Sequence, residues 1–188
     1  MGWWATALVC AQGLLGGVTV LFGLPAAVSV AHACLGQIYF CLMVCIAVLT
    51  GPRAMLSMPA KTAPGALKLQ QLGVLTTGFI LFQLILGATL RHTGLRPAFH
   101  LHLLVALFVT VHVLLLARRV FRDYHDLPDL VQPAAALAGL LGIQLVLGFY
   151  SWKMAAVTVT TAHVGVGALL LAASVILTLQ SYRRLLPL

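Results

Sequence analysis

The sequence predicts an all-α integral membrane protein, a bundle of six transmembrane helices arranged as three helical hairpins with an internal repeat. Hydrophobic residues make up 62% of the 188 residues and charged residues only 7%, a composition far outside the range of soluble domains. Six apolar stretches are long enough to cross a lipid bilayer as helices. The connections between them alternate between short and long, so we expect consecutive helices to pair.

Each predicted helix is an apolar stretch of about twenty residues, the length that spans the hydrocarbon core. In chain order the predicted helices cover residues 3–22, 26–50, 72–90, 99–117, 133–149 and 154–179. The short connections are residues 23–25, 91–97 and 151–153, and the longer, more polar ones are residues 52–71 and 118–132. Residues 1–4 lack a basic leader, and the first apolar stretch exceeds signal-peptide length, so no cleavable signal peptide is expected.

Lysine and arginine lie mainly on one side of these helices, which indicates the orientation. Three lie on the side of the short connections: Arg91, Arg96 and Lys153. Eight lie on the other side: Arg53, Lys61, Lys68, Arg118, Arg119, Arg122, Arg183 and Arg184. We therefore expect both termini and the long connections in the cytoplasm. The expected location of the chain is the cytoplasmic (inner) membrane of a bacterium or archaeon.

The net charge of +8 follows mostly from this topology and from attraction to anionic headgroups. No basic stripe with exposed aromatics is present, so nucleic acid is not an expected partner. The chain has no glutamate, and its only acids share one long connection: Asp123, Asp126 and Asp129. Four cysteines in the first two helices are interpreted as small apolar packing residues: Cys10, Cys34, Cys41 and Cys45.

A pattern of glutamine, glycine and histidine occurs three times. The glycine follows the glutamine by four residues, and the histidine lies about twenty residues past the glutamine. Such polar side chains cost free energy in apolar sequence unless they have a polar partner or a ligand, so the repetition predicts a site. The copies are Gln12, Gly16 and His32; Gln83, Gly87 and His102; and Gln144, Gly148 and His163.

Each histidine is predicted just beyond an outer turn, on the second helix of its hairpin. The three second helices run in the same direction, so two that face each other can place imidazoles on opposite sides of one flat ligand. The residue one turn later shares the helix face of the histidine and is small, which predicts space for a macrocycle: Gly36, Ala106 and Gly167. We expect the glutamines to bond across hairpins or to the ligand, at roughly 1 kcal/mol each.

A haem is the ligand that best fits paired neutral imidazoles in an apolar slot, because axial histidines bind its iron and its porphyrin buries apolar surface. Its propionates would meet Arg91, Arg96 and Lys153 through charge-assisted hydrogen bonds. The alternative is that the histidines and glutamines only hydrogen-bond between helices, since a duplication can also copy a packing motif.

Four other histidines keep the ligand assignment open. His100 is two residues from His102, on a different face of the same helix, and is an alternative ligand. His112 lies deeper on roughly the face of His102, where it suits a hydrogen-bonding partner or a ligand near the inner side. His92 is expected to be solvated or to bind a propionate, and His125, in the acidic connection, is expected to be solvated.

Three segments carry a resemblance to the haem A synthase family. Residues 12–44 resemble its third and fourth helices and read QGLLGGVTVLFGLPAAVSVAHACLGQIYFCLMV. Residues 84–94 are similar to its fifth helix and outer motif and read LILGATLRHTG. Residues 160–171 are similar to its final helix pair and read TTAHVGVGALLL. The resemblance covers nearly the whole chain.

The resemblance implies a fold of eight helices in two halves, of which this chain carries the last six. It divides the chain into a first hairpin (1–50), a cytoplasmic connection (51–71) and a four-helix haem-binding half (72–188). His102 and His163 match the histidines that ligate haem b in the family. His32 matches a histidine of the other half, where the methyl group of haem O is oxidised to the formyl group of haem A for cytochrome oxidase maturation.

Departures from the family pattern leave two functions open. The family's first hairpin, which carries a second histidine and a glutamate implicated in the oxidation, has no counterpart here, and the outer cysteine pair is missing. A partner subunit or a homo-oligomer can supply the missing part, the chain can be non-catalytic, or the reading frame can be truncated. The resemblance thus implies a haem A synthase-type oxidoreductase or, alternatively, a non-catalytic bis-histidine b-type cytochrome or oxidase-assembly subunit. A transporter is less favoured, because transporter sites usually have broken helices.

Overall fold

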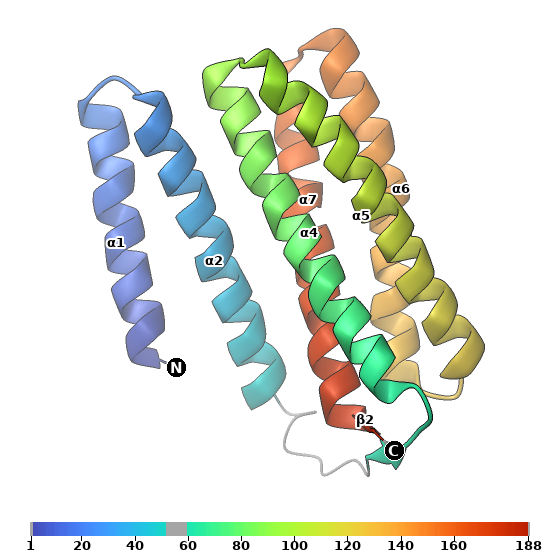
Figure 1. Ribbon diagram of the computed structural model, residues 1–188. Helices are drawn as coiled ribbons and strands as arrows, with labels where there is room; N and C mark the ends of the chain where they lie inside the picture. The colour runs from blue at the N-terminus through green and yellow to red at the C-terminus, as the bar shows by residue number, and fades with distance from the viewer. Residues whose placement is uncertain (1, 52–59, 188) are drawn as a thin grey trace.

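The computed structural model describes residues 2–51 and 60–187, and these ranges fold into six long helices (Figure 1). All six are long and apolar enough to cross a membrane, so the chain is a multi-pass membrane protein with the predicted all-α fold. Residues 52–59, and with them Arg53, lie outside the described residues. The helices are α1 (Gly2–Leu21), α2 (Ala26–Thr50), α4 (Ala66–Thr93), α5 (Arg96–Asp123), α6 (Pro128–Met154) and α7 (Val157–Arg184).

The helices pack as the three predicted hairpins, α1 with α2, α4 with α5 and α6 with α7. Short turns join the members of each pair. The φ angles of Gly94 and Ala155, +64° and +49°, mark the left-handed residues that end α4 and α6. We call the end with these turns the turn end, and the opposite end, where Arg118 and Arg184 lie, the basic end.

Four helices extend beyond the apolar stretches that predicted them. Helix α4 begins at Ala66 and takes in part of the predicted connection 51–71. Helices α5 and α6 take in most of residues 118–132, and the predicted turn at residues 151–153 is the end of α6. Hydropathy marks only the part of a helix inside the hydrocarbon, whereas the helix continues into the interface, where solvent reaches its polar residues.

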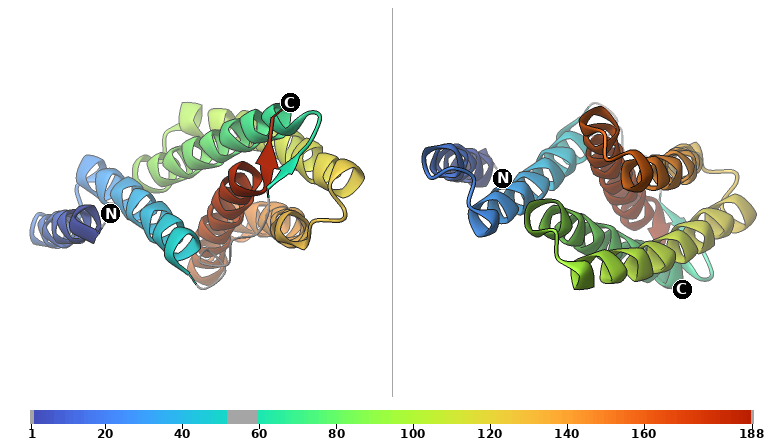
Figure 2. Two further views of the ribbon diagram at one scale, coloured as in Figure 1. Left: turned by 90° about the horizontal axis from the view of Figure 1, so that it is seen from below. Right: turned by 90° about the horizontal axis from the view of Figure 1, so that it is seen from above.

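Helices α4 to α7 form a four-helix bundle in which each helix packs against two neighbours, in the order α4, α5, α6, α7 and back to α4 (Figure 2). Helices α5 and α7 are therefore diagonally opposite. Helix α2 packs against α4 and α7, while α1 packs substantially only against α2, on the side away from the bundle (Figure 2). The core is apolar and includes Val113, Val120, Leu130, Leu137 and Leu171.

Polar side chains join α4 to α7 inside the bundle. Thr77 Oγ1 lies 2.7 Å from Ser174 Oγ and 3.2 Å from Thr178 Oγ1. The buried Gln70 side chain donates from Nε2 to the carbonyl of Ser181 at 3.3 Å and to that of Leu185 at 3.0 Å. These bonds satisfy polar groups that have no water available within a bilayer, and they fix α7 against α4.

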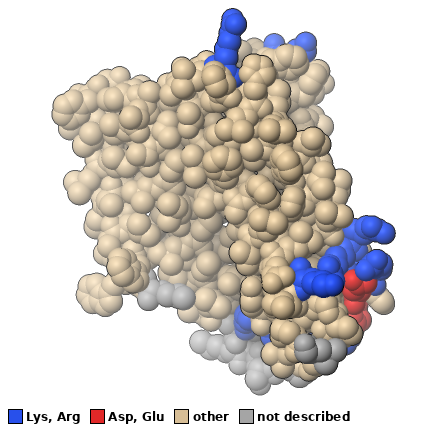
Figure 3. Space-filling model, in the orientation of Figure 1, with Lys and Arg blue, Asp and Glu red and all other residues tan. Residues whose placement is uncertain are grey.

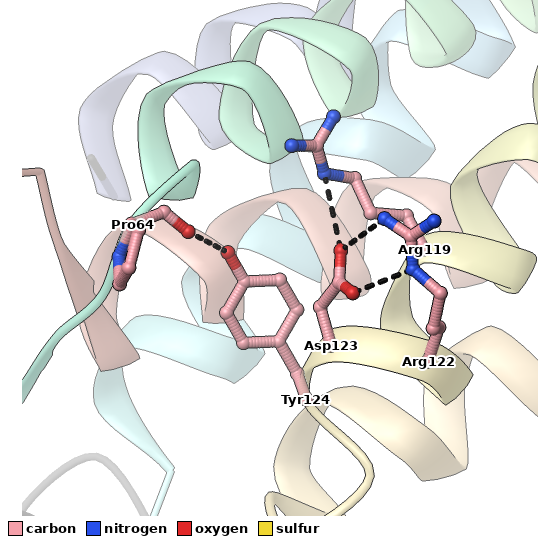
Figure 4. A network of polar contacts seen from close by, with 5 residues as sticks. All are labelled: Pro64, Arg119, Arg122, Asp123 and Tyr124. Atoms are coloured by element: carbon pink, nitrogen blue, oxygen red, sulfur yellow. Dashed lines mark hydrogen bonds and ion pairs between the residues drawn. The ribbon is translucent and has the colours of Figure 1, made fainter.

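Charged side chains lie at the two ends of the molecule, and the middle of the face in Figure 3 shows none. At the basic end the Asp123 carboxylate lies between two arginines (Figure 4). Arg122 donates from Nε and Nη2 to its two oxygens at 2.7 and 3.0 Å, and Arg119 Nε is 3.9 Å away. The Tyr124 hydroxyl donates to the Pro64 carbonyl at 3.3 Å, and burial raises the pKa of this tyrosine.

A two-stranded parallel sheet holds the connection before α4 against the end of α7. Strand β1 (Lys61–Thr62) pairs with β2 (Leu185–Leu186). Lys61 Nζ donates to Asp126 Oδ2 at 2.7 Å, and this bond lowers the pKa of the Asp126 carboxyl. The acids predicted to share one connection therefore have basic partners: Asp123 pairs within α5, Asp126 joins two connections, and Asp129 of α6 pairs with Arg184 of α7.

Replacing Asp129 with alanine is expected to lower the stability of the bundle. The Asp129 Oδ2 atom is 3.3 Å from Arg184 Nε, and Arg184 is only 9% exposed. Breaking a fully buried pair costs roughly 3–5 kcal/mol because a charge is left unpaired; since 27% of the Asp129 side chain is exposed, we expect about 2 kcal/mol. Thermal unfolding in detergent should show a lower Tm. The matched Asp126→Ala variant removes an exposed pair and should leave Tm unchanged; equal losses would contradict the assignment.

Candidate functional site

Each motif histidine lies against the motif glycine of the preceding helix. A Cβ atom built on the glycine would fall within the contact distance of the imidazole Cε1 atom, so any larger residue would displace the ring. The Cβ to Cε1 distance is 2.9 Å for Gly16 and His32, 3.2 Å for Gly87 and His102, and 3.1 Å for Gly148 and His163. These glycines therefore allow a close approach of two helices, and it occurs within each hairpin.

Each motif glutamine contacts the histidine of its own hairpin. The prediction that the glutamines bond across hairpins is therefore wrong. A short turn between the two helices brings residues about twenty apart to the same depth, where the amide reaches the histidine. Gln12 Nε2 donates to the His32 carbonyl at 3.1 Å, Gln83 Nε2 donates to the His102 carbonyl at 2.9 Å, and Gln144 Nε2 lies 3.4 Å from His163 Nε2.

The small size of Gly36 and Gly167 had predicted open space for a macrocycle one turn after His32 and His163, and this prediction is wrong for both glycines. A Cβ on Gly36 would lie 3.0 Å from Gln12 Nε2, and one on Gly167 would lie 3.2 Å from Gln144 Nε2. The glutamine amide fills this space, and a side chain larger than that of glycine would collide with the amide. Gly167 also meets the other hairpin, because its Cβ would lie 2.9 Å from Leu84 Cδ2; the sequence reasoning missed this contact.

The structure brings His102 and His163 together. They come from the diagonally opposite helices α5 and α7, yet their ring centroids are 6.4 Å apart, with 66° between the ring planes. Both side chains are partly buried, and the Nδ1 atom of each is buried without a hydrogen-bond partner among the described residues. Two imidazoles thus lie close together inside an apolar bundle, each with an unsatisfied Nδ1 atom.

The separation of the two imidazoles agrees with that of two axial ligands of one haem iron. A metal–imidazole bond is roughly 2 Å long, so rings on opposite sides of one iron have centroids roughly 6 Å apart. The observed 6.4 Å agrees with this value. Histidine is a common axial ligand of haem iron, and the glycine and glutamine behind each ring restrict its orientation.

His32 has no such counterpart. Its ring has the same glycine and glutamine contacts, and its Nδ1 atom is also buried without a partner. Within residues 2–51 and 60–187, however, no second histidine ring is paired with it, and no three His, Cys, Asp or Glu residues there are grouped as a metal site. The first hairpin is therefore built like the other two but carries half of a pair.

The alternative histidines bond to their own helix. His100 is exposed and its Nδ1 atom lies 2.9 Å from the Arg96 carbonyl. The Nδ1 atom of His112 lies 2.7 Å from the Phe108 carbonyl, and its ring packs on Phe79 with a centroid distance of 4.8 Å. His102 rather than either of them is the residue of α5 that faces His163. His92 and His125 are exposed.

The basic residues expected to bind propionates lie near the turn end. Arg91, Arg96 and Lys153 are exposed there, close in the chain to the helix starts that carry His102 and His163. Lys153 Nζ lies 4.5 Å from the centroid of the Trp152 ring. Among the described cysteines, Cys41 and Cys45 pack against the core and Cys10 is exposed, all as free thiols.

Replacing Gln83 with leucine is expected to loosen the bundle without removing the histidine pair. The variant loses the bond to the His102 carbonyl, and such bonds contribute roughly 1 kcal/mol in membranes. For a protein of this size, a change of this kind lowers Tm by about 2–4 °C, which thermal unfolding in detergent measures. Gln71→Leu on the exposed side of α4 is the matched control. A Tm equal to that of the control would show that the bond contributes nothing.

Comparison of the chain with protein-family models, with curated proteins and with solved structures finds no match. The resemblance to the haem A synthase family is thus a prediction from the residues quoted above. The contacts of His102 and His163 are independent of that resemblance.

Proposed function

We propose that this protein is a membrane haemoprotein of the haem A synthase type, in which His102 and His163 ligate a haem b. The observation that carries the proposal is the pair of imidazoles from opposite helices, 6.4 Å apart at their centroids. A bound haem b supplies one-electron transfer at its iron. The reaction proposed for the whole site is oxidation of the haem O methyl group to the formyl group of haem A, for cytochrome oxidase maturation, with haem b as the electron-transfer cofactor.

The chain's own residues orient and enclose the ligands. Gly87 and Gly148 hold the two rings at the depth where they meet, and the surrounding apolar helices exclude water from the nitrogen atoms. Arg91 and Arg96 would bind haem propionates by charge-assisted hydrogen bonds at the turn end. His32, with the same local contacts, would hold the substrate haem O.

A non-catalytic b-type cytochrome or oxidase-assembly subunit is the second candidate. It is favoured by the lack of a second imidazole facing His32 within the described residues and by the absence of glutamate from the sequence. In this function His102 and His163 keep their role, and His32 is a packing residue.

The proposed location is the cytoplasmic membrane of a bacterium or archaeon, with the basic end in the cytoplasm. The excess of lysine and arginine at that end supports this orientation. The bilayer is then the main partner of the exposed apolar side chains of the six helices.

A reduced-minus-oxidised absorption spectrum of the purified protein, with chromatography of the extracted haems, tests the proposal. A low-spin b-type spectrum together with haem O or haem A is expected of the haem A synthase type. Haem b alone would favour the second candidate, and a preparation without haem would contradict both.

A further inference from the structure

We propose that the α1–α2 hairpin pairs with the same hairpin of a second copy of this chain, and that the two His32 side chains then form a second haem-binding pair shared by the two copies. The shared site rests on the function proposed above. Three features of the structure support the pairing. The other two hairpins pack against each other, the Gly13 and Gly17 face of α1 is open, and residues 2–50 carry no charged side chain.

The two hairpins of the four-helix bundle show how units of this kind pair. Helix α4 packs against α7 and α5 packs against α6, so the first helix of each hairpin meets the second helix of the other. One contact is at Gly167, which lies against Gln144 of its own hairpin and against Leu84 of the other. This arrangement brings the two histidines to face each other.

The first hairpin makes the internal contacts, and α2 also packs against α4 and α7, but α1 lacks a substantial contact with another hairpin among the described residues. Gly36 matches Gly167 in the repeat and lies against Gln12 of its own hairpin. Gly13 matches Leu84, because each directly follows the motif glutamine. A Cβ on Gly13 or on Gly17 would meet nothing within 4 Å, so this face of α1 is open in one copy. Glycines four residues apart allow helices to approach closely in membranes.

The repeated pattern predicts which residue of a second copy would lie against this face of α1. If the first hairpin pairs as the other two do, Gly13 of one copy meets Gly36 of the second copy, and the first helix of each lies against the second helix of the other. Such a contact is the same in both directions, as a twofold dimer requires. All second helices run in the same direction, so the axis is perpendicular to the membrane and both copies keep one orientation.

Charge and burial are consistent with a second copy. Residues 2–50 contain no Lys, Arg, Asp or Glu, so pairing of identical surfaces brings no like charges together. The Gln12 Oε1 and His32 Nδ1 atoms are buried without a partner among the described residues, as are the corresponding atoms of the hairpins that do pair. The first hairpin thus has the polar groups of a paired unit.

Cross-linking between two differently tagged copies tests the pairing. All four native cysteines are replaced with alanine, one copy carries Gly13→Cys and the other Gly36→Cys, and both are co-expressed and oxidised in the membrane. We expect a disulfide-linked dimer that contains both tags. The control pairs Gly13→Cys with Gly139→Cys, on an open face of α6, and should give none. Because a Cβ on Gly36 lies 3.0 Å from Gln12 Nε2, the helix content and Tm of the Gly36→Cys chain are first compared with those of the unchanged protein. When they match, absence of the Gly13–Gly36 product, or an equal yield in the control, would overturn the pairing.

Haem content tests the shared site. With haem b added in excess, we expect three haems per dimer. Each chain binds one at His102 and His163, and the two chains share one at the His32 pair. His32→Ala should remove only the additional haem while the cross-link persists. One haem per chain that His32→Ala leaves unchanged would overturn the shared site and leave the proposed haem b ligands, His102 and His163, standing. A protein that binds no haem in any variant would instead overturn the proposed function.

Discussion

Replacing His102 or His163 with alanine is expected to abolish the b-type spectrum of the purified protein. The ring centroids are 6.4 Å apart, so either change removes one of the two proposed axial ligands. Loss of a hydrogen-bonding partner behind a metal ligand already lowers metal affinity by roughly 10–100-fold, and loss of the ligand itself should lower haem affinity further. Bound haem, measured per chain after purification, should fall to background in both variants.

His100→Ala is the matched control for His102→Ala. It removes an imidazole from the same helix only two residues away, but this side chain is exposed and its ring lies against the Arg96 carbonyl. The haem spectrum should be unchanged. If the His102 and His163 variants kept full haem, the ligand assignment would be wrong; if His100→Ala lost it, the ligand on α5 would be His100.

The sequence predicted the fold and the pairing of helices because both depend on local features. A stretch of apolar residues has to form a helix in a bilayer, since its backbone groups have no other partners there, and a short connection leaves two helices adjacent. The repeated spacing placed His102 and His163 at equal depth on helices that run in the same direction. Their 6.4 Å separation could not be predicted, because it depends on which helices are opposite in the bundle.

The contacts of the glutamines could not be read from the sequence in the same way. Gly36 and Gly167 looked like space for a ligand, because a glycine in a pattern shows only that something lies close. The structure shows that a glutamine amide of the same hairpin lies there. Whether a ligand or a neighbouring side chain lies against the glycine depends on side-chain length and on the rotation of each helix about its axis. The spacing of hydrophobic residues does not report either of them. The contact of Leu84 with Gly167 was missed because a leucine in an apolar helix carries no distinguishing signal.

Replacing Gly148 with valine is expected to weaken haem binding while leaving the helices in place. A Cβ at this position lies 3.1 Å from His163 Cε1, and the further methyl groups of valine push the imidazole away from its position opposite His102. Overpacking of this kind costs about 1–3 kcal/mol, which a six-helix bundle in a bilayer can tolerate. Haem affinity should fall by roughly 10–100-fold, as when a partner that orients a metal ligand is lost. A haem titration measures this fall, and far-ultraviolet circular dichroism measures the helix content.

Gly139→Val separates the effect on the imidazole from the general effect of valine in a transmembrane helix. Gly139 lies on the same helix α6, and a Cβ there would meet nothing within 4 Å. This variant should bind haem like the unchanged protein. If both variants bound haem equally well, the contact between Gly148 and His163 would have no part in positioning the ring, and the repeated glycine would serve helix packing alone. If only Gly148→Val lost the haem, the repeated glycine would position the histidine ring. The two variants differ only in what the added side chain contacts.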